Sequence, residues 1–333
     1  MAENKISVGG QALMEGIMMN GPKGVAMALR MPDGHIETQL KKQTLLRDKY
    51  KIAKVPFIRG PINFIEQMVF GYKALMESAE KTTVLEDGDE EPTSKLDKWL
   101  TDHFGPTMMT VIGIISAVIG FGIAFLLFMW LPSFVADLIL GKGESSTFKP
   151  AIEGVMRIII FVAYMWAVSL MKDIKRLFMY HGAEHKSIFC YENGLELSVE
   201  NVRKQLRFHP RCGTSFIFLT LIISIIISTV IVMIFPGVRT YKAIWMIVKI
   251  LLLPIIMSIG YEIIRLAGKK DNLFTRVVSA PGLWLQRITT KEPTDDIIEV
   301  GIASIKVALG MEEENINDKP EEADSEDLNN DAE

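Results

Sequence analysis

The sequence predicts a mainly α-helical, polytopic membrane protein with four transmembrane helices and a small β-containing unit at the N-terminus. Hydrophobic residues make up 49% of the 333-residue chain, and the mean hydropathy of +0.25 is high for a soluble protein of this size. The apolar residues also cluster in runs of about 20, the length that crosses a bilayer as a helix. These runs cover residues 108–131, 151–171, 215–235 and 243–266.

Residues 1–60 are expected to form the cytoplasmic β-containing unit. Two runs, residues 25–30 and 35–38, flank the sequence Pro32-Asp33-Gly34, which is typical of a hairpin turn. Glu15 is a lone acid among apolar neighbours. We interpret it as a carboxylate on the surface of a helix rather than as part of a site.

Residues 61–80 are predicted to form an amphipathic helix that begins at Pro61, a residue favoured in the first turn. Its apolar residues recur at helical spacing. The stripe suits a helix lying in the membrane surface, and packing against the cytoplasmic unit explains it equally well. The acidic segment that follows, within residues 81–107, is expected to be a linker.

Basic residues orient the four helices. Residues 1–107 carry 14 Lys and Arg and the 172–214 loop carries eight, whereas the 132–150 and 236–242 loops carry two each. The positive-inside rule then places both termini and the 172–214 loop in the cytoplasm. The apolar piece 134–140 is too short to cross a bilayer by itself, so we expect it to lie in the outer loop.

The 172–214 loop holds three of the five histidines and both cysteines. We expect the second membrane helix to continue into it as far as Lys186. On that helix His181 and His185 share a face with Glu184 beside them. H-x-x-E-H is the reverse of the H-E-x-x-H metalloprotease signature. In that chemistry the imidazoles hold a metal, commonly zinc, and the carboxylate is the general base.

His209 and Cys212 are the nearest candidates for further metal ligands. A turn at Asn193-Gly194 and a short helix starting at Ser198 would return the chain to them. A reducing cytoplasm favours a free thiol or a thiolate ligand over a disulfide. A closed structural site that uses all four residues stays open as a rival to a hydrolytic site, as does a metal-free set of interfacial histidines.

The C-terminal part is expected to contain an interfacial segment with Trp284 and then a cytoplasmic helix capped by Thr294, together covering residues 267–310. Residues 311–333 carry eleven acids and one Lys, a composition typical of a disordered tail. Without this tail, the net charge of −4 becomes +6. A basic cytoplasmic face indicates contact with anionic membrane lipids. A membrane-protein or ribosome partner and a homo-oligomer stay open, and no feature points directly to nucleic acid.

Several motifs together resemble one known family. They are Gly9-Gly10-Gln11-Ala12 with residues 14–19, His181-Gly182-Ala183-Glu184-His185-Lys186, residues 209–215, Pro281-Gly282-Leu283-Trp284-Leu285-Gln286 and residues 289–293. The set is similar to the YqhQ-like family, bacterial membrane proteins of unknown function that are labelled predicted metal-dependent enzymes. The resemblance covers residues 7–310 and implies a bacterial inner-membrane location. It implies no substrate.

Two functions from different classes follow. In the first, His181, His185, His209 and Cys212 bind a metal at the cytoplasmic membrane surface, and Glu184 is the general base in hydrolysis of a lipid or a membrane-embedded peptide. In the second, the protein is a non-enzymatic scaffold or accessory factor in membrane-protein biogenesis, and the same residues form a structural clasp. A transporter is a weaker reading, because no pair of broken helices is evident.

Overall fold

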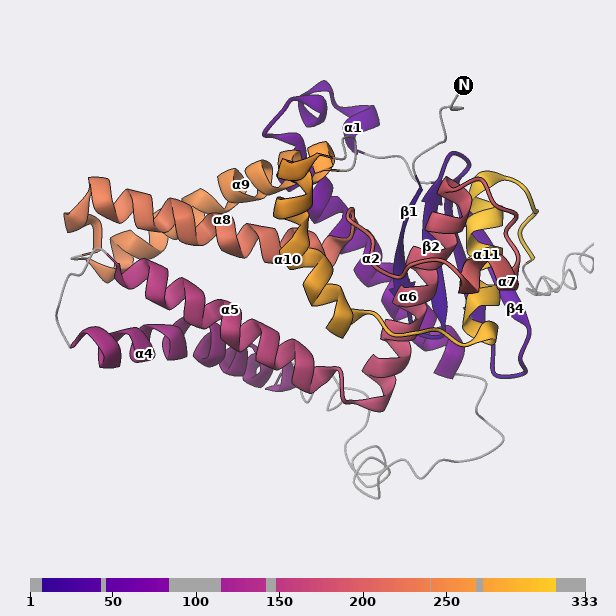
Figure 1. The fold of residues 1–333 in the computed structure, drawn as a ribbon, viewed down its shortest axis with the longest axis horizontal. Coiled ribbons are helices and arrows are strands. Elements are labelled where there is room, and N and C mark those ends of the chain that lie inside the picture. The colour runs from indigo at the N-terminus through magenta and orange to yellow at the C-terminus, as the bar shows by residue number, and fades with distance from the viewer. Residues whose placement is uncertain are drawn as a thin grey trace, which may run out of the picture.

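The computed structural model describes residues 8–42, 46–83, 115–141, 148–239, 241–267 and 272–315. Four helices within these ranges are long and apolar enough to cross a membrane: Ile115–Leu140, Lys149–Val168, Gly213–Ile234 and Ile244–Leu266. The predicted linker within 84–107 and most of the acidic tail lie outside the described residues. Figure 1 shows the long helices at one end of the molecule and a β-sheet at the other.

The N-terminal unit is a four-stranded antiparallel meander of β1 (Gly9–Leu13), β2 (Gly16–Gly21), β3 (Gly24–Arg30) and β4 (Ile36–Lys41). The hairpin predicted at Pro32-Asp33-Gly34 joins β3 to β4. Successive side chains of a strand point to opposite faces. Because β2 and β3 are apolar at nearly every position, both faces of the sheet must be covered.

Helices cover the sheet on both sides. On one face, α2 (Arg59–Thr83) packs Phe70, Ala74 and Leu75 against Met18 and Met27 and their neighbours. On the other face lie α6 (Lys172–Glu192) and α11 (Asp295–Leu309), which contact each other and the sheet (Figure 1). Segments more than 250 residues apart in sequence therefore share one core.

The helix predicted at 61–80 extends from Arg59 to Thr83. One stripe of it packs on the sheet, as one of the two readings of its amphipathic pattern expected. Its start also contacts α9 (Lys242–Ala267), where Asn63 donates a hydrogen bond to the Tyr261 hydroxyl at 2.9 Å. The apolar side chains on its remaining face are exposed, namely Ile65, Met68, Val69, Tyr72 and Met76.

Two predicted boundaries were wrong. The first long helix does not end near residue 131: it passes through a π-helical turn at Leu126–Trp130 and continues as α4 (Leu131–Leu140). Residues 134–140 thus belong to a helix rather than to a loop. Pro132 has no N–H to donate to the carbonyl of Phe128 four residues earlier, and the Arg157 side chain donates to that carbonyl instead, at 2.9 Å.

The second membrane helix also does not continue into the histidine segment. It forms α5 (Lys149–Val168) and stops, and α6 begins at Lys172 after Met171 adopts an extended conformation. The Ser169 hydroxyl donates to the carbonyl of Trp166 at the break. Because of this break, α6 turns away from the long apolar helices and lies along the sheet (Figure 1).

Three further helices complete the junction between the sheet and the long apolar helices, namely α7 (Val199–Arg203), α8 (Gly213–Ile234) and α10 (Leu273–Thr289). The short helices α1 (Leu46–Lys49), η1 (Lys51–Lys54) and η3 (Pro236–Arg239) lie in connecting segments. Ser198 caps α7 by accepting a hydrogen bond from the Asn201 amide at 3.3 Å, as predicted. The segment expected to be interfacial around Trp284 is part of α10, which contacts α5, α8 and α9. Thr294 precedes α11 as expected, although its side chain makes no capping hydrogen bond.

Candidate metal centre

Helix α6 presents the H-x-x-E-H residues inside the protein rather than at its surface. Every residue from Gly182 to Ile188 is buried. The reason lies partly in Gly182: a Cβ atom there would overlap the carbonyl oxygen of Lys291, so only glycine lets the chain after α10 pass so close. The tight crossing brings the end of α10 onto the His181 face of α6.

Cys212 reaches the same place from the other side. It is the residue that precedes α8, in an extended conformation, and its side chain is buried. The loop that carries it is held by Gln286 of α10, which is fully buried. The Gln286 amide donates to the carbonyl oxygen of His209 at 2.8 Å and to the Ser215 hydroxyl at 2.9 Å, and its oxygen accepts from the His209 amide at 2.7 Å.

His181, His185 and Cys212 converge. The Nε2 atom of His181 lies 3.2 Å from the Sγ atom of Cys212. The two imidazole rings of α6 have centroids 4.5 Å apart. One donor atom from each of the three residues lies within 4.8 Å of the other two, close enough for a single metal ion. The structure thus brings together three of the four residues predicted as ligands.

Backbone carbonyls fix which tautomer each imidazole adopts when it is neutral. The Nδ1 atom of His181 lies 2.8 Å from the carbonyl oxygen of Thr289, and that of His185 lies 2.6 Å from the carbonyl oxygen of Arg207. A carbonyl can only accept, so each Nδ1 carries the hydrogen and each neutral ring keeps its lone pair on Nε2. Metal-binding histidines are commonly oriented in this way by an outer partner.

His209 lies beside this group rather than in it. Its ring packs 5.6 Å from the His185 ring and 4.8 Å from the Phe189 ring, measured between centroids. Its Nδ1 atom accepts a hydrogen bond from the Arg211 amide at 3.3 Å, and its Nε2 atom lies 3.5 Å from a carboxylate oxygen of Glu192. Burial and the neighbouring His185 lower the pKa of His209 to about 4, so it is neutral at pH 7.

Glu184 lies next to the group on the same helix. The space that a Cβ of Gly10 would fill is 2.9 Å from its Cγ atom, so the carboxylate-bearing side chain rests against β1. The side chain is buried, with 5% exposed, and the described residues offer the carboxylate no hydrogen-bond partner. Burial raises the pKa of Glu184, although His185 and His181 oppose this. A buried carboxylate with a raised pKa is suited to accepting and releasing a proton.

Electrostatics favour a thiolate at Cys212. Burial alone would raise the pKa of this thiol, but His181 and His185 lie so close that they hold it well below its usual range. In turn, burial would lower the pKa of His181, but the Cys212 side chain outweighs it and raises that pKa to about 9. Cys190, which has no such neighbours, has its pKa raised by burial.

Several features of the site had no signal that sequence reasoning could use. The carbonyls of Thr289 and Arg207 are backbone atoms, which any residue supplies. Gln286 was noticed only as part of a family motif. Lys186, also buried, donates to the carbonyl of Arg203 at 2.8 Å and pairs with Glu292, which ties α6 to α7 and to the segment after α10.

Glu15 was interpreted wrongly as a residue on a helix surface. It lies in the two-residue turn between β1 and β2 with a φ of 49°. Its carboxylate pairs with Arg176 and accepts a hydrogen bond from the Tyr180 hydroxyl at 3.0 Å. It therefore ties the sheet to α6 one turn before His181.

Known relatives agree with the resemblance that the motifs indicated. The chain matches the family described as "Protein of unknown function (DUF1385)" over residues 55–311. It is 34% identical over 318 residues to "Uncharacterized protein YqhQ" of Bacillus subtilis (strain 168), an alignment that covers 94% of this chain and 96% of the relative. No solved structure matches. The chain therefore belongs to the DUF1385 family, and the YqhQ-like assignment made from its motifs is confirmed.

Proposed function

We propose that this chain is an inner-membrane protein that binds zinc through His181, His185 and Cys212 and uses it, with Glu184, to hydrolyse a membrane substrate at the cytoplasmic surface. One observation carries the proposal. Two imidazoles whose Nδ1 atoms are engaged by backbone carbonyls place their remaining nitrogens near one cysteine sulfur. Neither a hydrophobic core nor a set of exposed interfacial histidines requires that arrangement.

The donor set fits zinc. Nitrogen and sulfur ligands are those that zinc prefers, and tetrahedral bonds of about 2.0–2.1 Å to nitrogen and 2.3 Å to sulfur separate the two donors by roughly 3.5 Å. The distance between His181 Nε2 and Cys212 Sγ is 3.2 Å, close to that value. Three protein ligands leave a fourth tetrahedral position open, as in catalytic zinc sites.

The residues around the open zinc position would each have a separate role in hydrolysis. Zinc, when bound, lowers the pKa of a water molecule to about 7. Glu184 accepts a proton as the water attacks and returns it to the leaving group, the cycle of a general base that becomes a general acid. The Thr289 and Arg207 carbonyls keep both imidazoles in the metal-binding tautomer. We propose that His209 does not bind the zinc ion but packs beside its ligands, because its Nδ1 atom already accepts a hydrogen bond.

The metal content of the purified protein tests the proposal. We expect about one zinc ion per chain after chelator-free purification, and loss of most of that zinc in H181A, H185A and C212S, since removing a ligand should weaken binding by more than the roughly 10–100-fold typical of outer-shell changes. His35→Ala is the matched control, because His35 follows the β3–β4 turn and pairs with Asp33. Wild-type protein without metal, or H181A with full occupancy, would contradict the site.

The two cysteines provide an internal comparison. In zinc-free protein at pH 7, we expect a small alkylating reagent to modify Cys212, whose lowered pKa makes it a thiolate, and to spare Cys190, whose pKa is raised. Added zinc should protect Cys212 because it occupies the sulfur. Peptide mass spectrometry measures both sites in one sample. Equal modification of the two cysteines, or no protection by zinc, would be the contrary result.

A non-enzymatic scaffold is the alternative, and one contact favours it. The His181 Nε2 atom lies 3.2 Å from the Cys212 Sγ atom, so a direct contact between these side chains can clasp α6 to the start of α8. In that case H181A should impair cellular function while E184Q does not. A closed structural metal site that recruits His209 would instead be recognised by X-ray absorption, which would report four protein ligands in place of three and a water oxygen.

A further inference from the structure

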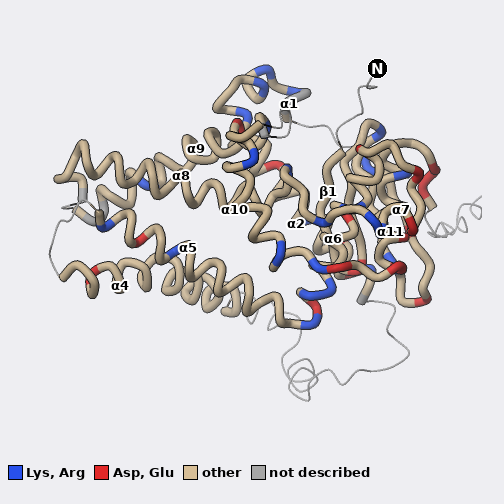
Figure 2. Tube along the Cα trace, viewed as in Figure 1, with Lys and Arg blue, Asp and Glu red and all other residues tan. Residues whose placement is uncertain are grey.

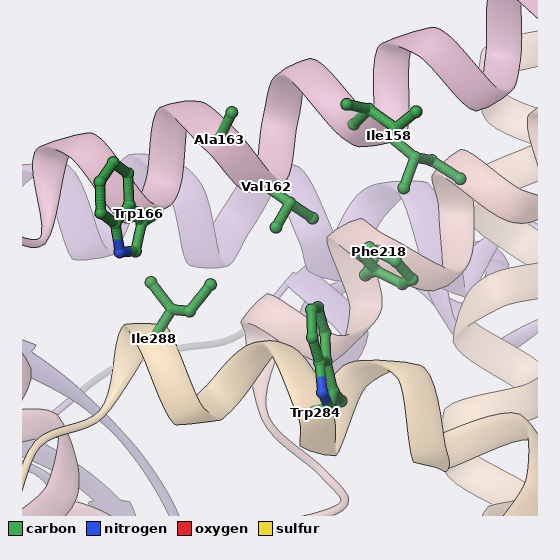
Figure 3. Close-up of a pocket in the computed structure, with 8 residues that line it drawn as sticks. Ile158, Val162, Ala163, Trp166, Phe218, Trp284 and Ile288 are labelled. Carbon is green, nitrogen blue, oxygen red and sulfur yellow. The ribbon is translucent and has the colours of Figure 1, made fainter.

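A groove lined only by apolar side chains lies between α5, α8 and α10. It has a volume of about 570 Å³. Figure 3 shows Trp166, Val162 and Ile158 of α5 along one side, with Trp284 and Ile288 of α10 opposite and Phe218 of α8 between them. Ile159, Trp166 and Trp284 are each more than half exposed, so the groove opens to the surroundings of the helices.

One end of the groove adjoins the candidate metal centre. Ile288 immediately precedes Thr289, whose carbonyl binds His181. Phe218 is six residues after Cys212, which is about 9 Å along a helix that rises 1.5 Å per residue. Trp284 and Gln286 are two residues apart and point to nearly opposite sides of α10, so this helix lines the groove with one face and holds the Cys212 loop with the other. The groove and the His/Cys group are therefore neighbours that share α10.

We propose that this groove holds one acyl chain of a membrane lipid and thereby directs the lipid headgroup to the His/Cys group. The inference rests on the proposed function and names its substrate class. α5 and α8 are two of the four helices long and apolar enough to cross a membrane. A groove that opens between them in a bilayer meets hydrocarbon chains, and such a chain needs no hydrogen-bond partner from the lining.

The apolar lining favours an acyl chain over an extended peptide. An extended segment of peptide would leave its N–H and C=O groups unpaired against a lining without polar side chains, which costs several kcal/mol for each group. An acyl chain has no such groups.

Basic residues surround the end of the groove where the headgroup would lie. Figure 2 shows Lys and Arg where α10 ends and α6 begins. Four of these, Lys172, Lys175, Arg287 and Lys291, have no ion-pair partner among the described residues, although the acidic Asp173 lies among them. Cations beside an apolar groove favour an anionic headgroup, such as that of phosphatidylglycerol.

Photo-crosslinking tests the occupant. Purified full-length protein would be placed in vesicles that contain phosphatidylglycerol with a diazirine at the middle of one acyl chain, and the labelled residues identified by mass spectrometry. We expect labels on the groove-lining residues of α5 and α10. Val162→Trp places a larger side chain in the groove, into which Val162 points in Figure 3, and should reduce these labels about tenfold, equivalent to about 1.4 kcal/mol. Val155→Trp, at an exposed position of α5 outside the groove, should not.

The outcomes separate this inference from the proposed function. Zinc content measured on the same samples should be unchanged in V162W, while H181A should lose zinc and keep the labels. Equal labelling of the groove and of the Val155 face, or undiminished labelling in V162W, would overturn the inference and leave the metal proposal standing. Equal labelling by phosphatidylcholine with the same acyl chain would overturn the headgroup preference.

Discussion

Replacing Glu184 by glutamine should slow hydrolysis by about 10²–10⁴-fold, the usual contribution of a general acid–base residue. The substitution keeps the shape and burial of the side chain but removes its ability to accept a proton. Because the carboxylate makes no hydrogen bond to a described residue, no structural contact is lost. Zinc content should stay at the wild-type level, since Glu184 is not one of the three converging donors.

Release of lipid fragments from vesicles of bacterial lipid extract, followed by mass spectrometry, would measure this effect. Glu200→Gln is the matched control, because Glu200 is exposed on α7 and pairs only with Lys204. The wild-type pH profile adds a second readout. Glu184 acts as a base only when it is deprotonated, and burial raises its pKa. As the pH is lowered, activity should therefore be lost at a pH higher than about 4.3, the ordinary pKa of a glutamate. Full turnover by E184Q would exclude the carboxylate as the base.

Replacing Gln286 by leucine should loosen the site and destabilise the fold together. The change leaves the His209 amide, the His209 carbonyl and the Ser215 hydroxyl without their buried partner. Each buried polar group left unpaired costs roughly 1–3 kcal/mol. Three such groups cost roughly 3–9 kcal/mol, so at about 2–4 °C per kcal/mol the midpoint of thermal unfolding should fall by at least roughly 6 °C.

The same substitution should weaken zinc binding by about 10–100-fold, as loss of an outer-shell partner does. The reason is that Gln286 holds the loop that carries Cys212, while the two imidazoles have their own carbonyl partners. Gln205→Leu is the control, since Gln205 bonds to Asn193 and Asn201 near the protein surface. A Q286L protein that unfolds earlier but binds zinc as tightly as wild type would show that Gln286 supports the fold alone.

Local patterns allowed part of this structure to be predicted. Runs of apolar residues located the four long helices, and Pro32-Asp33-Gly34 located the β3–β4 turn. Helical spacing also placed His181, Glu184 and His185 on one helix. Each of these inferences depends on neighbours within a few positions, where propensity and periodicity act.

The rest depends on contacts between distant segments. Nothing near Lys172 reveals that α6 leaves the membrane helices and lies on a sheet formed 150 residues earlier. The pairing of Glu15 with Arg176 spans 161 positions, and the Gln286 bonds to the Cys212 loop span more than 70. Packing decides such contacts, and a single sequence carries no local trace of them.

The two imidazoles and the sulfur belong to different parts of the fold. His181 and His185 belong to a helix fastened to the sheet, whereas Cys212 sits on the first residue before a helix long enough to cross a membrane. A rocking of that helix by a few degrees, as a thinner or thicker bilayer imposes, changes the nitrogen–sulfur spacing directly. If that helix spans a bilayer as proposed, the affinity for the proposed zinc ion should therefore depend on bilayer thickness.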